Sequence, residues 1–319
     1  MVKIKIVSSQ NTLEKEKNKY FKYNLGVDQK AFYFDEGAEM FCKSISMDGL
    51  NKGIKFDSDT FNFIEKFLEK DKDVSLVSLG CGSGIREKIL LNIAEEKGYD
   101  IKFYGVDSSF QMIEKAQENL NEMKTSCELI YADFSEENFF KELNSTIDKK
   151  SQKVFAFLGA TLGNVPQNYI ADKLNNMVNS DDILIIEVRG TEKLDDLASN
   201  KYFKKYLFNI TDEDEINFLY APLQKLGIDI DKGKLMLNMN REDAIKDLVF
   251  KFGFKVNQNM KFKLNNEKIT LLEGDYIKLF EIRVYELKAL KKFFEIRNFK
   301  CLGFQMLNED LLQIAFKKL

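Results

Sequence analysis

Three glycines in one short loop are the residues whose spacing most directly suggests chemistry. Gly80, Gly82 and Gly84 belong to the segment Val77–Gly84, which follows an apolar run and precedes a stretch with helical periodicity. Glycine has no Cβ, so the backbone turns tightly there and comes close to a ligand. Such a loop between a strand and a helix is typical of nucleotide-binding folds, although alone it is a weak signal. Cys81 lies in the same loop, and we expect it to line the ligand as a small residue rather than to react.

Acidic residues follow the next two apolar runs. Asp107 and Ser108 come after one run, and Asp133 and Phe134 come after the next. An acid at the end of the second strand accepts hydrogen bonds from ribose hydroxyls. An acid followed by an aromatic ring suits the amino group and the face of an adenine. Glycine and aspartate are also ordinary turn residues. Because three such sites follow three consecutive strands, however, they predict one ligand pocket at the carboxyl edge of a sheet.

The elements that must hold these residues alternate along the middle of the chain. Apolar runs typical of strands alternate with helical periodicity, which predicts parallel βαβ units and a doubly wound α/β sheet. The predicted strands are Val74–Leu79, Ile101–Val106, Cys127–Tyr131, Val154–Leu158 and Ile183–Val188. The predicted helices are Ile85–Lys97, Phe110–Met123, Glu136–Leu143, Gln167–Val178 and Tyr285–Ile296. A hairpin of Phe299–Met306 and Leu311–Lys317 completes a predicted seven-stranded sheet.

Two regions interrupt this alternation and predict a second domain. We assign 58–190 plus 285–319 to the sheet domain and 1–57 plus 191–284 to an α+β cap that binds substrate. Within the insert, Leu248–Lys263 and Lys268–Phe280 alternate in the manner of half-buried strands.

Composition narrows the classes of function. The 319 residues are 44% hydrophobic and 31% charged with a net charge of −3, which indicates a globular protein without the basic excess of nucleic-acid enzymes. There are no histidines, and the four cysteines form no CxxC pair, so we expect no metal site. Neither a signal peptide nor a long apolar span is evident, and we expect a cytoplasmic monomer or homodimer without membrane contact.

The sequence resembles a known family, the histidine-specific N-methyltransferases of the ergothioneine pathway. These are Rossmann-like class I methyltransferases that use S-adenosylmethionine and release S-adenosylhomocysteine. The glycine loop, Asp107 and the Asp133–Phe134 pair stand where the family binds this cofactor. Arg86 stands where the family has a basic residue in the cofactor loop, and Phe157–Asn164 is similar to the family's Phe-Leu-Gly-Ser-Thr-Ile-Gly-Asn pattern. The resemblance also implies that Gly159 contacts the cofactor.

The resemblance further implies a substrate site. Asn164 would hold the methyl acceptor, although Asn before Pro166 is also a good helix N-cap, and the two roles are compatible. Lys30–Phe41 is similar to an N-terminal family motif, which implies that Tyr33 contacts substrate. Glu281 matches a family carboxylate with a substrate-binding and catalytic role. Arg283 stands where the family has Ser, and it either clamps an anionic substrate group or pairs with Glu281.

Departures from the family leave the acceptor open. Asp48–Phe56 replaces the family's Tyr-Tyr-Pro-Thr-Arg stretch, so a substrate-contacting aromatic is missing, and the expected cap tyrosine has three candidates, Tyr202, Tyr206 and Tyr220. We therefore predict methylation of the amine of a small molecule, such as an amino acid or its derivative. The alternatives are a small-molecule O- or S-methyltransferase and a non-catalytic binding protein with this fold.

Overall fold

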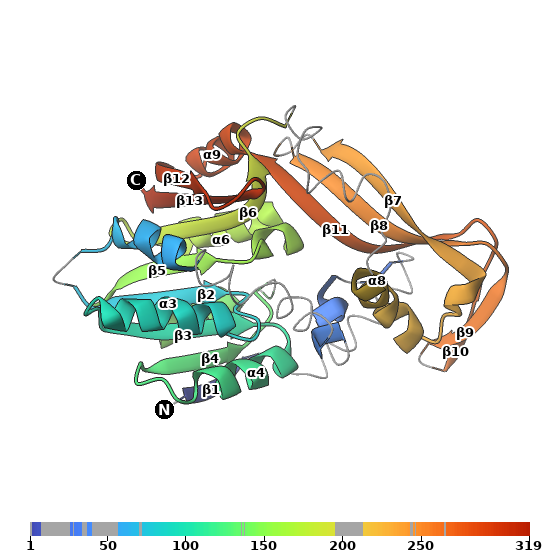
Figure 1. Ribbon diagram of the computed structural model, residues 1–319, viewed down its shortest axis with the longest axis horizontal. Coiled ribbons are helices and arrows are strands. Elements are labelled where there is room, and N and C mark those ends of the chain that lie inside the picture. The colour runs from blue at the N-terminus through green and yellow to red at the C-terminus, as the bar shows by residue number, and fades with distance from the viewer. Residues whose placement is uncertain are drawn as a thin grey trace.

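A mainly parallel β-sheet with helices on both faces forms the larger part of the molecule (Figure 1). The computed structural model describes residues 2–7, 26–27, 29–33, 37–39, 57–69, 72–134, 136, 138–194, 213–242, 245, 247–264 and 266–319. The strands of this sheet are β1 (Val2–Ile6), β2 (Val74–Leu79), β3 (Ile101–Asp107), β4 (Cys127–Tyr131), β5 (Gln152–Phe157), β6 (Ile183–Thr191), β12 (Phe299–Met306) and β13 (Leu311–Lys318).

The end of β2 lies at the point in the sheet where the order in which strands are added reverses direction. The strands run in the order β4-β3-β2-β5-β6-β13-β12, parallel from β4 to β6, while β13 is antiparallel to β6. From β2 the chain builds outward to β3 and β4 on one side, and then returns to add β5 on the other side. Ligands of doubly wound sheets bind beside the carboxyl ends of the strands at such a switch point.

Helices cover both faces of the sheet because each buries an apolar stripe at helical spacing. Helix α4 shows the pattern: Met112, Ile113, Ala116 and Leu120 are buried, and the Ser109 hydroxyl caps its first turn by accepting from the Met112 amide. One face carries α5 (Phe139–Thr146), α6 (Gln167–Met177) and α9 (Leu287–Glu295). The other carries the helical residues 57–65, α3 (Ile85–Glu96) and α4 (Phe110–Leu120).

The predicted strands and helices of this sheet are present, with ends that shift by a few residues. The prediction missed the helical residues 57–65 and one strand. Strand β1 pairs in parallel with β4 and adds an eighth strand at the edge of the predicted seven. Residues 2–6 therefore belong to the large sheet and not to the cap to which 1–57 was assigned. The alternating pattern of this short segment does not say which sheet it joins.

A second group of antiparallel strands extends away from the large sheet (Figure 1). Strands β7 (Gly233–Glu242), β8 (Asp247–Val256) and β11 (Tyr276–Glu286) pair side by side, and β9 (Met260–Leu264) and β10 (Glu267–Leu271) form a separate hairpin. The end of β11 meets the end of β6, where Tyr285 pairs with Gly190. Each of the two strand segments predicted in the insert is thus divided into two strands.

An apolar cluster holds an N-terminal segment against this second group of strands. The 3-10 helix η1 (Gln29–Tyr33) contributes Phe32, whose ring packs 5.3 Å from those of Phe218 on α8 (Glu213–Lys225) and Phe280 on β11. The Val27 amide also donates to the Lys278 carbonyl at 2.8 Å. These contacts fix η1 opposite the carboxyl edge of the large sheet. The remaining short helices are η2 (Thr161–Asn164) and η4 (Ile230–Lys232).

Candidate active site

The glycine loop folds back on the end of β3. Gly80, Gly82 and Gly84 have φ angles of 82°, 54° and 70°, a region that L-residues with a Cβ rarely adopt. The amides of Gly80 and Cys81 both donate to the Val106 carbonyl, at 2.8 and 3.0 Å. The loop is therefore a tight turn that lays its backbone along the edge of the sheet.

Asp107 is fixed by backbone amides at the end of β3. Its Oδ2 accepts from the Gly82 amide and its Oδ1 from the Ser109 amide, both at 2.9 Å. Burial raises the pKa of this carboxyl to about 6, and the amides of Ser109, Gly82 and Ser108 oppose that rise. Each carboxylate oxygen has a second acceptor position. Asp107 can therefore accept further hydrogen bonds from a diol while the loop keeps its place.

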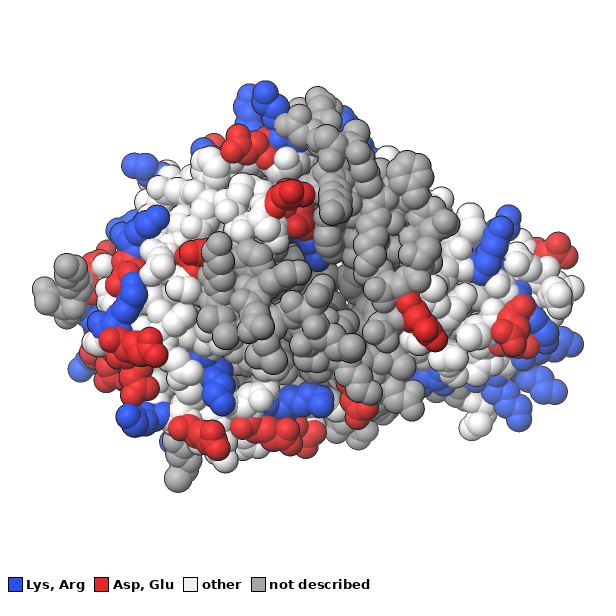
Figure 2. Space-filling view, viewed as in Figure 1, with Lys and Arg blue, Asp and Glu red and all other residues white. Residues whose placement is uncertain are grey.

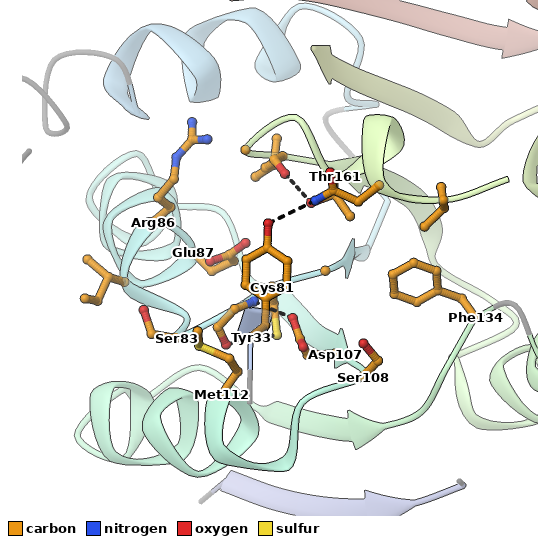
Figure 3. A pocket seen from close by; sticks show the side chains of 17 residues that line it. Tyr33, Cys81, Ser83, Arg86, Glu87, Asp107, Ser108, Met112, Phe134 and Thr161 are labelled. Atoms are coloured by element: carbon orange, nitrogen blue, oxygen red, sulfur yellow. Dashed lines mark hydrogen bonds between the residues drawn. The ribbon is translucent and has the colours of Figure 1, made fainter. Parts of the chain in front are cut away.

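A cavity opens above the glycine loop, and most of the predicted cofactor residues line it (Figure 3). Its lining comprises Tyr33, Gly80, Cys81, Gly82, Ser83, Ile85, Arg86, Glu87, Asp107, Ser108, Met112, Phe134, Leu158, Gly159, Thr161, Asn164 and Val165. Two glycines make room in it. A Cβ placed on Gly82 or on Gly159 would meet no atom within 4 Å, and both residues have a positive φ. Side chains there would fill the space that a ligand needs.

Two predicted cofactor residues lie outside this lining. Gly84 begins α3 and packs against α4, where a Cβ would stand 3.2 Å from that of Ala116. Asp133 is buried, and of the Asp133–Phe134 pair it is the Phe134 ring that faces the cavity. The role of Asp133 toward an adenine thus stays a prediction. The role of Gly84 indicated here is close packing of two helices.

Arg86 lines the cavity, and its guanidinium group forms hydrogen bonds with the carboxylates of Glu187 and Asp57. Its Nη1 and Nη2 donate to the two oxygens of Glu187 at 2.6 and 3.1 Å, and its Nε donates to Asp57 Oδ1 at 2.8 Å. Burial lowers the pKa of Arg86, but Glu187 and then Asp57 outweigh it, so Arg86 stays charged. Five donors in a fork exceed the three used, which leaves Arg86 able to bind an anion.

Glu187 is the centre of a buried polar network that reaches the cavity wall. It is fully buried, and besides Arg86 it accepts from the Gly159 amide at 2.9 Å and from Gln313 Nε2 at 2.7 Å. Burial raises the pKa of its carboxyl, but the Arg86 charge dominates and keeps it below its usual value. Gln313 also donates to the hydroxyl of Thr60 at 2.7 Å. The network joins β6, β13, α3 and the helical residues 57–65.

Asn164 and Tyr33 meet at one end of the cavity. Asn164 Nδ2 donates to the Tyr33 hydroxyl at 3.2 Å, and Asn164 Oδ1 accepts from Gln29 Nε2 at 2.6 Å. Burial raises the pKa of the Tyr33 phenol far above its usual value, so this group is neutral at physiological pH. Tyr33 comes from η1 and reaches over the cavity toward η2 (Figure 3). The structure therefore brings together two of the four predicted substrate residues.

Glu281 and Arg283 lie on β11 and do not line the cavity. Glu281 Oε1 pairs with Lys278 at 2.8 Å, and its Oε2 accepts from Arg283 at 3.1 Å. Arg283 also donates to the buried Asp247 at 2.8 Å. The sequence left two roles for Arg283, binding an anionic substrate group or pairing with Glu281. The structure shows the pair with Glu281. Of the three cap tyrosines, Tyr202 and Tyr206 lie outside the described residues, and Tyr220 packs on Phe254 in the apolar cluster.

Several residues of the site were not predicted from the sequence. Glu87, Met112 and Thr161 line the cavity, and Gln29 and Glu187 hold residues that do. Glu187 had a signal, since it is an acid inside a buried strand, and such a group requires a partner. No sequence pattern indicated Gln29, because only the packing of η1 against β11 brings Gln29 to Asn164.

The fold and the site together define the class. A doubly wound sheet that ends in an antiparallel hairpin, with a glycine loop and an acid at its switch point, is the architecture of the Rossmann-like methyltransferases. The family model described as "Histidine-specific methyltransferase, SAM-dependent" matches residues 27–312. The chain belongs to this family, and its cofactor is S-adenosylmethionine.

Solved structures similar to this chain are distant in sequence. The methyltransferase CcbJ of Streptomyces caelestis is 12% identical with a TM-score of 0.40, covering 85% of this chain and 98% of its own. The glycopeptide N-methyltransferase MtfA, solved with S-adenosylmethionine, is 8% identical with a TM-score of 0.40 over 82% and 93%. CalS10, an amino pentose methyltransferase of Micromonospora echinaspora, is 10% identical with a TM-score of 0.37 over 82% and 90%. A search of curated proteins found no match.

The residues of the cavity fit this cofactor. Asp107 would offer two oxygens to a ribose, Phe134 would offer an aromatic ring and Arg86 a cation to a carboxylate, while Gly82 and Gly159 leave open space. Among the described residues, no group of three His, Cys, Asp or Glu side chains stands ready to hold a metal ion. No helix in the described part of the chain has the length and apolar character that a membrane span requires.

Proposed function

We propose that this protein methylates the amine of a small molecule, an amino acid or a derivative of one, with S-adenosylmethionine. The observation that carries the proposal is the pair formed by Tyr33 and Asn164 on the wall of the cofactor cavity. A neutral phenol and a carboxamide bind polar groups of an acceptor without fixing a charge beside it. The matched family is described as histidine-specific, which supports an amino acid as the acceptor.

Methyl transfer to an amine requires the protein to align the two reactants and does not require a strong general base. The cofactor supplies a methyl group on a sulfonium, which makes the carbon electrophilic. Asn164 and Tyr33 orient the acceptor, and Gly82 and Gly159 keep the space that lets the two reactants approach. Asp107 and Arg86 hold the two ends of the cofactor.

The amine must lose a proton before it can attack, and the described residues favour water as the acceptor of that proton. Glu281 carries two cations, Lys278 and Arg283, and does not line the cavity. The Tyr33 phenol is neutral and already accepts a hydrogen bond from Asn164. Neither residue is therefore placed to act as a general base, and the fraction of neutral amine in solution sets the reactive population.

The surface supports a small acceptor over a nucleic acid. Over the described residues of the face in Figure 2, lysine and arginine side chains alternate with aspartate and glutamate side chains. A phosphate backbone binds to clustered positive charge, and the net charge of the whole chain is −3.

A screen of amino acids and other small amines tests this function. Purified protein would be incubated with S-adenosylmethionine, and methylated products identified by mass spectrometry with fragmentation that locates the methyl group. We expect an N-methylated product, histidine included among the candidates, and loss of most turnover in Asn164→Ala. Products methylated only on oxygen or sulfur would overturn the proposal, and so would cofactor binding without any methylated amine.

A further inference from the structure

Glu87 is a buried carboxylate on the wall of the cofactor cavity that the proposed chemistry does not use. It lies in the first turn of α3, is 2% exposed and lines the cavity beside Arg86. Its Oε1 accepts from the Ser78 hydroxyl at 2.8 Å. No lysine or arginine of the described residues forms an ion pair with it. The neighbouring Arg86 forms its ion pairs with Glu187 and Asp57.

A carboxylate in this position is costly without a cation. Burial raises its pKa to about 7, while Ser78 and the charge of Arg86 lower it and the charge of Asp57 raises it. The nearest charged neighbours therefore do not compensate it. A buried acid that faces a ligand cavity and lacks a cation of its own is suited to a cationic group of the ligand.

The cofactor offers such a group at the matching end. Its adenosine part belongs with Asp107 and Phe134, which leaves the methionyl part, with one carboxylate and one ammonium, for the rest of the cavity. In Figure 3, Phe134 lies at one side and Arg86 at the opposite side, with the Glu87 carboxylate between them, pointing inward. Arg86 provides the charge for the carboxylate, and Glu87 provides the charge for the ammonium.

We propose that Glu87 is the binding residue for the ammonium group of the cofactor's methionyl part. This inference rests on the identity of the cofactor and not on the identity of the methyl acceptor. The two are tested separately, because cofactor binding is measured without any acceptor present.

The test compares two ligands and two variants by calorimetric titration. S-adenosylhomocysteine carries the ammonium, and its deaminated analogue, with hydrogen in that place, does not. Against the wild type, the analogue is expected to bind about 10- to 100-fold more weakly, the effect of one buried charge-assisted hydrogen bond. Against Glu87→Gln, which keeps the size and the acceptor for Ser78, the two ligands should bind within about twofold of each other. Glu96→Gln, with the same charge change on the exposed end of α3, should behave as wild type.

Proton release gives a second readout. Titrations near pH 7 in two buffers of different ionisation enthalpy should show that S-adenosylhomocysteine displaces a fraction of a proton from the wild type, because an ammonium lowers the pKa of Glu87. Glu87→Gln should lose that release. Equal loss of both ligands in Glu87→Gln, or an unchanged preference for the ammonium, would overturn the proposal. So would a wild type that binds neither ligand, since the cofactor site itself would then be absent.

Discussion

Gln29 and Asn164 are joined by a hydrogen bond of 2.6 Å from Nε2 to Oδ1, although 135 positions separate them. Gln29 Nε2 also donates to the Glu281 carbonyl at 3.1 Å, and the Glu281 amide donates back to Gln29 Oε1 at 3.4 Å. These backbone contacts determine which way the Gln29 amide faces. Asn164 is in turn oriented with its oxygen toward Gln29 and its nitrogen toward Tyr33. Gln29 is thus a positioning residue for the proposed acceptor site.

Replacing Gln29 with Glu removes the donor and leaves the size unchanged. A carboxylate cannot donate to Asn164 Oδ1 or to the Glu281 carbonyl, so the Asn164 amide loses its fixed orientation. We expect the KM of histidine, or of the best amine in the screen, to rise about tenfold. The cofactor Kd should stay within about twofold. Steady-state kinetics against the exposed control Gln224→Glu checks this, and an equal loss of cofactor affinity would contradict it.

Asp107→Ala should weaken the binding of S-adenosylhomocysteine about 100-fold. The variant loses the acceptor proposed for the ribose and also the two amide contacts that fix the glycine loop. Calorimetric titration measures the change, and Asp100→Ala, an exposed acid just before β3, is the matched control. Unchanged affinity in Asp107→Ala would show that the ribose is held elsewhere.

The pair of Arg86 and Glu187 should behave as a coupled unit in stability measurements. Glu187→Gln leaves the partly buried guanidinium of Arg86 less compensated, with an expected loss of about 3 kcal/mol in the free energy of unfolding. Arg86→Met leaves the buried carboxylates of Asp57 and Glu187 without their cation, with a similar loss in the free energy of unfolding. The double variant should be more stable than the sum of the single losses predicts, by about 2 kcal/mol. Urea unfolding of all four proteins tests the coupling, and simple additivity would argue against it.

Glu87→Gln should stabilise the ligand-free protein at high pH. The pKa of Glu87 is raised from 4.5 to about 7 in the folded state, so the folded state binds this proton more tightly. The stabilising effect of this proton on the folded state is therefore lost as the pH rises through 7. Above pH 7, ionised Glu87 lowers the free energy of unfolding of the wild type by on the order of 1–3 kcal/mol. Thermal unfolding at pH 5 and pH 8.5 should show the variant gaining stability relative to wild type mainly at pH 8.5. A gain that is the same at both pH values would contradict this assignment.

The pH dependence of turnover should reflect the pKa of the acceptor amine and not the pKa of a general base in the enzyme. At saturating cofactor, kcat/KM for the amine is expected to rise with pH until the pKa of the free amine is reached. The reason is that no described side chain of the acceptor site is placed to take its proton. Tyr33→Phe should raise KM and leave the shape of the profile unchanged. A plateau well below the pKa of the amine would reveal an enzyme base.

The local order of residues was sufficient to predict the large sheet and the position of the glycine loop beside Asp107. A glycine loop between a strand and a helix, and an acid at the end of the next strand, depend on contacts close in the chain, and parallel strands bring their carboxyl ends to one edge. These local patterns therefore predicted that Gly80, Gly82 and Asp107 meet at one edge of the sheet, where all three line the cavity. The pairing of β1 with β4 was not predicted, because a short strand can join the edge of either sheet with similar burial.

Only the tertiary structure decided which charged side chains line the cavity and which pair with one another. Arg86 is both a wall of the cavity and the partner of Glu187, 101 positions away, and Glu281 is turned toward Lys278 and Arg283 instead of the cavity. Within the described part of the chain, no cation pairs with Glu87, which α3 buries beside Ser78. The sequence by itself determined the type of sheet, which depends on short-range patterns, and its resemblance to a known family indicated the cofactor. The assignment of partners among buried charges depended on long-range packing, which the chain acquires only when it folds.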